Sequence, residues 1–335
     1  MNGKQQLVSE VGEFGLIDII NTDTIIDKMH VLKGIGDDCA VVRTADPNSY
    51  QLFTTDMLVE SIHFSKLMQD EDVGYKAIIC SVSDIAAMGG MPRDCLISLG
   101  TPGNIEVARI ERLYAGMRQA CKAYNVNIIG GDTVCSPQGI IINVALTGTI
   151  DSRYVVYRSG ASIGDLVVVS GKLGLSAIGL VLLQQQIAQT AENQHFFEKH
   201  CRPTARVELG QLLAKHGATA MNDISDGLAS ELNEIANSSA VGILIDERLI
   251  PVARLPLAIE ALLEKSSTHY ALYGGEDYEL VFTIAPSSYA RFSAATKAAV
   301  AVIGQVTAEF SGVQLRTIDG SLITLESRGY NHFSN

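Results

Sequence analysis

The sequence has no C-x-x-C pair, no long apolar run and fewer basic than acidic residues. Its six cysteines lie far apart, which argues against zinc ribbons and redox dithiols, and we interpret them as buried, reduced, structural thiols. The longest apolar-leaning run, Leu173–Leu183, is shorter than the ~20 residues that cross a bilayer. Residues 1–14 lack the layout of a secretory signal peptide. We therefore expect a cytoplasmic location and no membrane partner.

The shortage of basic residues limits the ligands that the protein can bind directly. Lys and Arg number 25 against 37 Asp and Glu, which gives a formal net charge of −12. Nucleic-acid backbones and anionic membranes are bound through basic patches, so neither is an expected partner. An anionic ligand would have to be held through metal ions or through backbone amides.

Common nucleotide-binding signatures are also absent. Gly171-Lys172 looks like part of a phosphate-binding loop, but that loop requires glycine at Leu166 and serine or threonine at Leu173. The dinucleotide fingerprint that begins at Gly34-Ile-Gly36 fails at Cys39, where its third glycine would fall. The H-R-D and D-F-G motifs of protein kinases are missing. A nucleotide, if bound, must be held by a different architecture.

The length of 335 residues favours two domains, because single hydrophobic cores rarely grow beyond ~250–300 residues. Apolar runs between Gly, Asp or Pro predict strands, and apolar residues at helical spacing predict helices. The predicted strands are 39–43, 51–55, 95–100, 126–129, 140–150, 166–170, 242–245, 279–284 and 301–306; the predicted helices are 73–88, 106–124, 175–187, 205–216 and 227–237. A polar segment, 151–164, separates the halves. We expect an α/β (α+β) protein with domains 1–150 and 151–335.

Acidic residues gather in six short segments beside glycine, serine or threonine. The segments are Gly34-Ile-Gly-Asp-Asp-Cys39, Thr54-Thr-Asp56, Ser81-Val-Ser-Asp84, Gly130-Gly-Asp-Thr133, Asn222-Asp-Ile-Ser-Asp-Gly227 and Tyr273-Gly-Gly-Glu-Asp-Tyr-Glu279. A single such aspartate usually caps a turn or a helix. Six of them in apolar surroundings indicate more, because converging carboxylates repel one another unless cations neutralise them. Oxygen ligands suit Mg²⁺ or Mn²⁺, and magnesium held this way usually arrives with substrate phosphates.

The order of the motifs along the chain is more specific than any one of them. They are GIGDDCA, TTD with His63 downstream, GYKA, SVSDIAAMGG-MP, IIGGDT, RSGA-IGD, GKLG, DISDGL, GGEDYEL and RGYNHF. This ordered set resembles the thiamine-monophosphate kinase family of the aminoimidazole-ribotide synthetase-like superfamily. The resemblance implies a homodimer whose N-terminal sheet domains pair, and a C-terminal three-layer α/β domain that closes the active-site cleft. It also implies ATP-dependent phosphorylation of thiamine monophosphate to thiamine diphosphate, the last step of thiamine diphosphate biosynthesis, with ATP as co-substrate and several Mg²⁺ ions.

By motif position, the resemblance assigns roles to particular residues. The implied Mg²⁺ ligands are Asp38, Thr54, Thr55, Asp56, Asp84, Asp132, Asp223 and Asp226. The implied ATP contacts are Tyr114, Gly131, Asp132, Arg158 and Ser225. The implied contacts to thiamine monophosphate are His63, Glu276 and Tyr330. Within these groups the implied catalytic residues are Asp56, Asp84, Asp132 and Arg158.

The expected reaction needs little from the protein besides charge neutralisation. The second pKa of a phosphate monoester is about 6, so the acceptor is ionised near pH 7 and no general base is required. Mg²⁺ ions that bridge two polyanions, with a guanidinium clamp from Arg158, would supply the rest. Glu276 beside Tyr278 would suit the permanent cation of the thiazolium ring.

Other interpretations stay open. His63 can instead be a half-buried histidine at a strand end, and Tyr330 can be a packing anchor for the tail. We predict that His195, His200 and His216 lie on polar helix faces, and we assign them no functional role. Selenophosphate synthetase and the hydrogenase maturation carbamoyl dehydratase are disfavoured, because each needs a reactive cysteine near one end of the chain. A non-catalytic metal-binding or scaffolding protein is the alternative of a different class, and a turnover assay separates it from a kinase.

Overall fold

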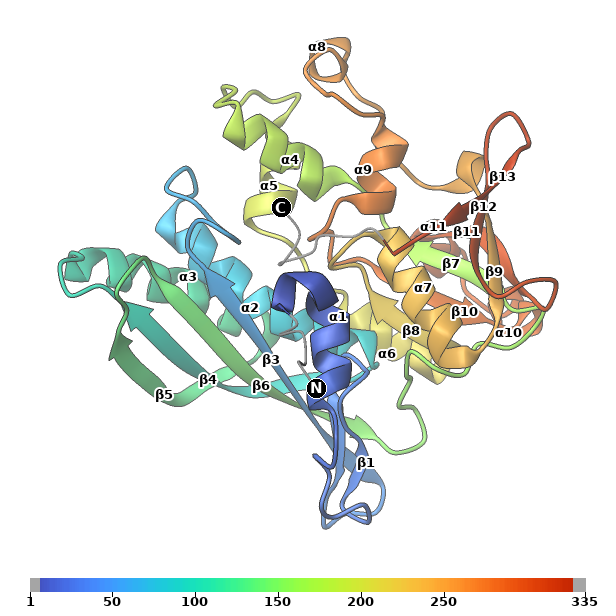
Figure 1. Ribbon diagram of the computed structural model, residues 1–335, viewed down its shortest axis with the longest axis horizontal. Helices are drawn as coiled ribbons and strands as arrows, with labels where there is room; N and C mark the ends of the chain where they lie inside the picture. The colour runs from blue at the N-terminus through green and yellow to red at the C-terminus, as the bar shows by residue number, and fades with distance from the viewer. Residues whose placement is uncertain (1–6, 328–335) are drawn as a thin grey trace, which may run out of the picture.

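Residues 31–151 supply a six-stranded sheet and residues 166–325 a seven-stranded sheet (Figure 1). The structure, a computed structural model, describes residues 7–327. The first sheet has the order β1-β2-β3-β6-β4-β5, and its pairs are antiparallel except β4 with β5. Its strands are β1 (Val31–Lys33), β2 (Ala40–Arg43), β3 (Ser49–Val59), β4 (Met91–Thr101), β5 (Asn127–Cys135) and β6 (Ile141–Asp151).

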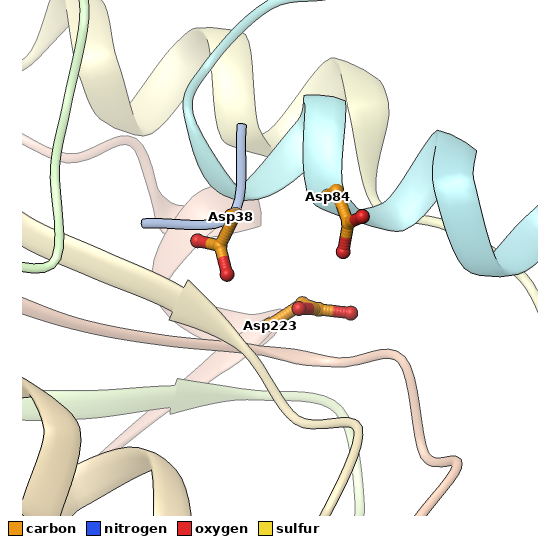
Figure 2. Close-up of side chains that lie close together, drawn as sticks. All are labelled: Asp38, Asp84 and Asp223. Carbon is orange, nitrogen blue, oxygen red and sulfur yellow. The ribbon is translucent and has the colours of Figure 1, made fainter. Parts of the chain in front are cut away.

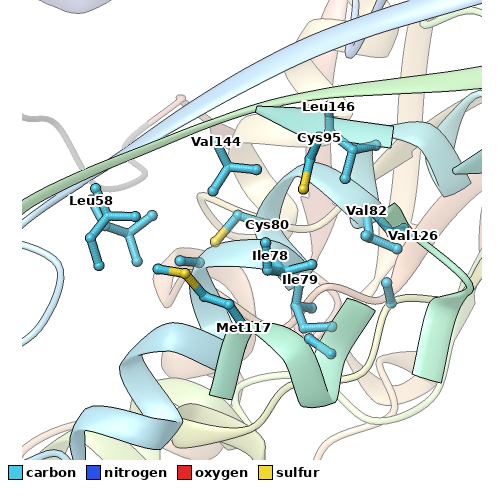
Figure 3. Close-up of a cluster of buried hydrophobic side chains, with 14 of the residues drawn as sticks. Leu58, Ile78, Ile79, Cys80, Val82, Cys95, Met117, Val126, Val144 and Leu146 are labelled. Carbon is cyan, nitrogen blue, oxygen red and sulfur yellow. The ribbon is translucent and has the colours of Figure 1, made fainter. Parts of the chain in front are cut away.

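Two long helices, α2 (Asp70–Ala87) and α3 (Val107–Tyr124), build the core on one face of the first sheet. Acidic residues fill the first turn of α2, where they complement the positive end of the helix dipole. The helices approach backbone to backbone, since a Cβ atom at Gly74 or Gly116 would overlap a carbonyl oxygen of the other helix. Figure 3 shows the side chains of this core, with Val144, Leu146 and Cys95 of the strands lying over side chains of α2 and α3.

The other face of the first sheet, which we call the open face, carries exposed apolar side chains. Strand side chains alternate between faces, so Leu52 and Leu58 of β3 enter the core while Phe53 and Met57 point the other way. The exposed row on the open face consists of Phe53, Met57, Leu96 and Val134, which are 44%, 55%, 46% and 56% exposed.

The second sheet is covered on both faces, because neighbouring residues of its central strands enter different cores. Val167 and Val169 of β7 pack with α7 (Leu228–Ser239), whereas Val168 packs with α6 (Val207–Lys215). This helix–sheet–helix arrangement confirms the expected three-layer α/β fold. The strand order is β13-β12-β9-β11-β7-β10-β8. The strands are β7 (Leu166–Ser170), β8 (Ala218–Asp223), β9 (Gly242–Asp246), β10 (Leu280–Ile284), β11 (Val300–Thr307), β12 (Gly312–Arg316) and β13 (Leu322–Leu325).

The remaining helices lie at the N-terminus and around the second sheet (Figure 1). They are α1 (Val8–Ile20), α4 (Leu175–Gln184), α5 (Gln194–Cys201), the 3-10 helix η1 (Glu247–Leu249), α8 (Leu257–Glu260), α9 (Ser267–Tyr273), α10 (Pro286–Ala290) and α11 (Ala294–Ala298). Between residues 7 and 327, none of the helices has the length and apolar character that a bilayer span requires.

All predicted strands and helices are present, but their boundaries differ and several further strands and helices were not predicted. β5 continues to Cys135, six residues beyond the predicted end at residue 129. Strands β1, β8, β12 and β13, helices α1, α5 and α8–α11 and the 3-10 helix η1 were not predicted. The extension of β5 explains one error about the cysteines. Five of the six are buried, but Cys135 is exposed because it ends an edge strand whose side chains reach solvent.

Candidate active site

A cleft of about 1200 Å³ is lined by residues from both halves of the chain. Its walls come from β3, α2, α4 and α9 and from the loops that follow β8 and α9. Carboxylates line one end. The rest of the lining includes apolar and aromatic side chains such as Leu58, Phe64, Leu180, Tyr270 and Tyr273. The cleft therefore joins a strongly polar end to an apolar wall.

Three aspartates from distant parts of the chain meet at the polar end (Figure 2). Asp38 precedes β2, Asp84 lies in the last turn of α2, and Asp223 ends β8. One carboxylate oxygen of each lies within 4.8 Å of those of the other two. We call these three residues the aspartate trio. Two further predicted ligands, Asp56 and Asp226, line the same cleft.

Hydroxyl groups orient these carboxylates. The Thr54 hydroxyl donates to Asp84, and Ser83 Oγ donates to Asp223 Oδ2 at 2.5 Å. Ser81 Oγ donates to Asp56 Oδ2 at 2.6 Å. The serines and Asp84 share α2, so one helix supplies both a member of the trio and the groups that hold its neighbours.

The carboxylates outnumber the positive charges around them. Burial raises the pKa of Asp38 and of Asp84 well above the usual range, and the carboxylate of Asp223 raises both pKa values further. Burial also raises the pKa of Asp223 to about 6 and that of Asp226 to about 7. A divalent cation would reverse this effect, and a donor set made only of oxygen fits Mg²⁺ or Mn²⁺. Asp38 Oδ2 is buried without a hydrogen-bond partner among the described residues, so it is available as a ligand.

Arg158 closes one side of the trio. Its Nε and Nη2 atoms donate to Asp38 Oδ1 at 3.1 and 2.6 Å, and its Nη1 pairs with Glu234 Oε2 at 2.9 Å. Its backbone N–H donates to Asp37 Oδ1 at 3.1 Å. Burial acts to lower the pKa of Arg158, but Asp38, Glu234 and other carboxylates raise it overall. The guanidinium is thus a fixed positive charge beside the trio.

Glu276 lies on another wall of the cleft, in the loop between α9 and β10. Its Oε1 forms an ion pair at 2.5 Å with Nζ of Lys76, a lysine of α2 with a fully buried side chain. Its Oε2 lies 3.3 Å from Nδ1 of His200. His63 also lines the cleft, and its Nδ1 accepts a hydrogen bond from the Val59 N–H at 3.0 Å.

The assignment of His200 to a polar helix face is wrong. His200 is 2% exposed, because the buried face of α5 consists of Phe196, Phe197, His200 and Cys201. Burial lowers the pKa of His200 to about 4, and Lys76 lowers it further, so its imidazole is neutral at pH 7. His195 is exposed and His216 is half-buried.

Two of the predicted metal ligands do not join the trio within one chain. Thr55 borders the cleft, but strand alternation turns its side chain to the open face, where its Oγ1 accepts from Asn143 Nδ2 at 2.8 Å. Asp132 on β5 is exposed on the same face, in register with Ser98 of β4. Its carboxylate accepts a hydrogen bond from the Thr133 N–H at 2.9 Å.

Of the other predicted ATP contacts, two line the cleft and two lie elsewhere. Arg158 and Ser225 line the cleft. Gly131 lies on β5 beside Asp132, where a Cβ atom would overlap the carbonyl oxygen of Ile97, and Tyr114 packs against the core from α3. Tyr330 lies outside the described residues.

Sequence reasoning missed several side chains in the cleft and behind its walls. Lys76 and His200 flank Glu276, Glu234 holds Arg158, and Glu13 of α1 lines the cleft near Asp226. The signal for Lys76 was its position inside the apolar helix pattern, where a lysine would be buried only with a partner.

Comparisons with known proteins show the family to which this fold belongs. Family models described as AIR synthase related protein match residues 36–150 with their N-terminal domain and residues 162–315 with their C-terminal domain. The chain is 38% identical to the thiamine-monophosphate kinase of Bacillus subtilis over 96% of this chain and 99% of the relative, and 38% identical to that of Aquifex aeolicus over 97% and 99%. A solved structure described as AaThiL complexed with AMPPCP and TMP has 37% identity and a TM-score of 0.86, covering 98% of this chain and 100% of that one. The chain belongs to the thiamine-monophosphate kinase family.

Proposed function

We propose that this protein transfers the γ-phosphoryl group of ATP to thiamine monophosphate, giving thiamine diphosphate. The observation that carries the proposal is the two-ended cleft, with the aspartate trio and Arg158 at one end and an apolar wall with Glu276 beyond it. Curated relatives named thiamine-monophosphate kinase and a solved relative complexed with AMPPCP and TMP support it.

The chemistry follows from the charges at the polar end. The side chains that would hold several Mg²⁺ ions are Asp38, Thr54, Asp56, Asp84, Asp223 and Asp226. Bound magnesium would neutralise the phosphate groups of both substrates. Arg158, fixed by its carboxylate partners, would direct its remaining N–H donors at a phosphate oxygen. The acceptor phosphate is ionised near pH 7, so direct in-line transfer needs no general base from the protein.

The other assignments remain part of the proposal. Ser225, Tyr114 and Gly131 would contact ATP, and His63 and Glu276 would contact thiamine monophosphate. Residues 1–150 would form the ATP- and Mg²⁺-binding domain, and residues 151–335 would close the cleft. The position of Ser225 and His63 in the cleft lining supports their roles.

We further propose that two copies pair through their open faces. The exposed apolar row on this face supports the pairing, because exposed apolar side chains on one face of a sheet favour contact with a partner. Asp132, Thr55 and Gly131 lie on or beside the same face, so a second copy would bring them next to another chain. Their roles as metal or ATP contacts therefore depend on the dimer.

The dimer can be tested by placing a charge on the open face. Leu96→Lys is expected to convert the dimer to a monomer, because a buried unpaired ammonium in an apolar interface is unfavourable. Sedimentation analysis measures the change. The control is Leu257→Lys on α8, an exposed leucine (84%) away from the first sheet, which should leave the mass unchanged. A monomeric wild-type protein, or a dimeric Leu96→Lys variant, would contradict the proposed interface.

The activity is tested by incubating the purified protein with ATP and thiamine monophosphate. We expect thiamine diphosphate to form with Mg²⁺ present, and the rate to fall at least ~100-fold when EDTA removes the metal, since Arg158 alone cannot neutralise both the trio and the substrate phosphates. Chromatographic detection of thiamine diphosphate measures both. Absence of product with Mg²⁺ would refute the kinase proposal and favour a non-catalytic metal-binding protein.

A further inference from the structure

Lys76 has a role that the carboxylate chemistry does not explain. It lies on α2, with 0% of its side chain exposed, and its Nζ is 2.5 Å from Glu276 Oε1. A lysine is almost never fully buried without a partner, so Glu276 accounts for its position. Lys76 and Asp84 are separated by about 12 Å along the helix axis, given 1.5 Å per residue. The lysine therefore acts on a different part of the cleft from the trio.

Two side chains lie against the two oxygens of the Glu276 carboxylate. While Oε1 pairs with Lys76, Oε2 faces His200, whose Nδ1 is also 3.2 Å from Ser176 Oγ. A carboxylate has about four acceptor sites on its two oxygens, so these contacts leave sites free. The Glu276 side chain is 27% exposed in the cleft lining. A ligand in the cleft can therefore still reach the carboxylate.

The loop that carries Glu276 has an unfavourable backbone conformation. Glu276 and Tyr278 have φ angles of +65° and +50°, a region that non-glycine residues rarely adopt. Two side chains of α2, one turn apart, contact these two residues. Lys76 pairs with Glu276, and Cys80 Sγ lies 3.0 Å from the Tyr278 hydroxyl. The Glu276 N–H also donates to the Ser225 carbonyl oxygen at 2.6 Å. Helix α2 thus holds this loop through side chains as well as through packing.

We propose that Lys76 is a positioning residue for substrate binding, which fixes Glu276 against the cleft so that it can receive the organic part of thiamine monophosphate. The inference rests on the proposed function. It changes the expected role of Glu276. Because its charge is already paired with Lys76, Glu276 serves as an oriented hydrogen-bond acceptor and not as a free counter-ion for the thiazolium ring.

The two roles of Glu276 predict opposite effects of Lys76→Met, which keeps an unbranched side chain one atom shorter and removes the charge. If Lys76 positions Glu276, the KM and the calorimetric Kd for thiamine monophosphate rise at least ~10-fold. The kcat then stays within ~3-fold of wild type and the KM for ATP is unchanged, because the trio is remote. If Glu276 were a free counter-ion, losing the lysine would expose more negative charge and tighten binding of the cationic substrate. An unchanged or lower Kd therefore overturns the inference.

A matched control and a double variant complete the test. Lys122→Met, at an exposed site on α3, should leave the KM and kcat unchanged. Because Lys76 acts through Glu276, Lys76→Met should add little to the effect of Glu276→Gln on the Kd. If the fold-changes in Kd of the two single variants multiplied in the double variant, Lys76 would not act through Glu276, and the positioning role would be overturned. The double variant also leaves no buried charge unpaired, so it keeps the test available if Lys76→Met alone fails to fold.

Calorimetry separates this inference from the proposed function. A wild-type protein that binds thiamine monophosphate without phosphorylating it would refute the kinase activity. The comparison of Kd values would still decide the role of Lys76 in that case. Failure of the wild-type protein to bind thiamine monophosphate at all would overturn both.

Discussion

Replacing Asp84 by asparagine is expected to lower kcat by about 10³-fold while leaving the metal-free protein at least as stable as the wild type. Asp84 would be a ligand of Mg²⁺, and asparagine supplies a neutral oxygen in place of a charged one. In the metal-free protein, Asp84→Asn is expected to act on stability instead. Three carboxylates with oxygens within 4.8 Å of one another repel, and removal of one charge relieves that repulsion. The Thr54 hydroxyl, which donates to Asp84, can still donate to the amide oxygen of the asparagine.

Thermal unfolding with Mg²⁺ or with EDTA checks the stability part of this prediction. Mg²⁺ should raise the Tm of the wild type, because it binds the folded state, and should raise that of Asp84→Asn much less. Asp18→Asn on α1, which removes an exposed carboxylate outside the cleft, is the matched control and should respond to Mg²⁺ as the wild type does. Wild-type turnover in Asp84→Asn, or a clear loss of stability in EDTA, would show that Asp84 is not a metal ligand.

Local patterns in the sequence predicted much of the fold because the determining contacts are local. The apolar spacing of α3 follows from the helical period, and Thr54 and Asp56 face the cleft together because strand side chains alternate. The same alternation separates Thr55 from its neighbours, which the motif alone did not reveal. Residue order in a motif therefore says which residue types are present, but strand geometry decides which of them meet.

The convergence of the trio could not be derived from local pattern. Ser83 and Asp223 are 140 residues apart in sequence, and their contact depends on how α2 packs against the second half of the chain. β8 was not predicted, so the position of Asp223 at its end was not available either. His200 was a different kind of error. Phe196, Phe197 and Cys201 share its helix face, and this apolar spacing predicts that His200 is buried.

Replacing Arg158 by methionine is expected to lower kcat strongly, as Asp84→Asn does, but with the opposite effect on the stability of the metal-free protein. The guanidinium pairs with Asp38 and Glu234, whose side chains are 1% and 16% exposed. Methionine leaves both carboxylates without this partner, which should lower the free energy of unfolding by about 2–4 kcal/mol. The kcat should fall at least ~100-fold, because a fixed donor to the transferred phosphate is lost.

Urea unfolding in EDTA measures the free energy of unfolding of each variant relative to the wild type. The sign of each change tests whether the cleft carries excess negative charge. If the trio carries excess negative charge, removal of a carboxylate stabilises the metal-free fold, and removal of the guanidinium destabilises it. Mg²⁺ should then restore part of the stability of Arg158→Met, because a cation at the trio compensates for the lost charge near Asp38.

Arg158→Lys is the informative intermediate: it keeps the charge but loses the forked geometry, so stability should recover more than kcat. An Arg158→Met protein as stable as the wild type would mean that Asp38 and Glu234 do not depend on the guanidinium, and the charge argument for the whole metal site would fail with it.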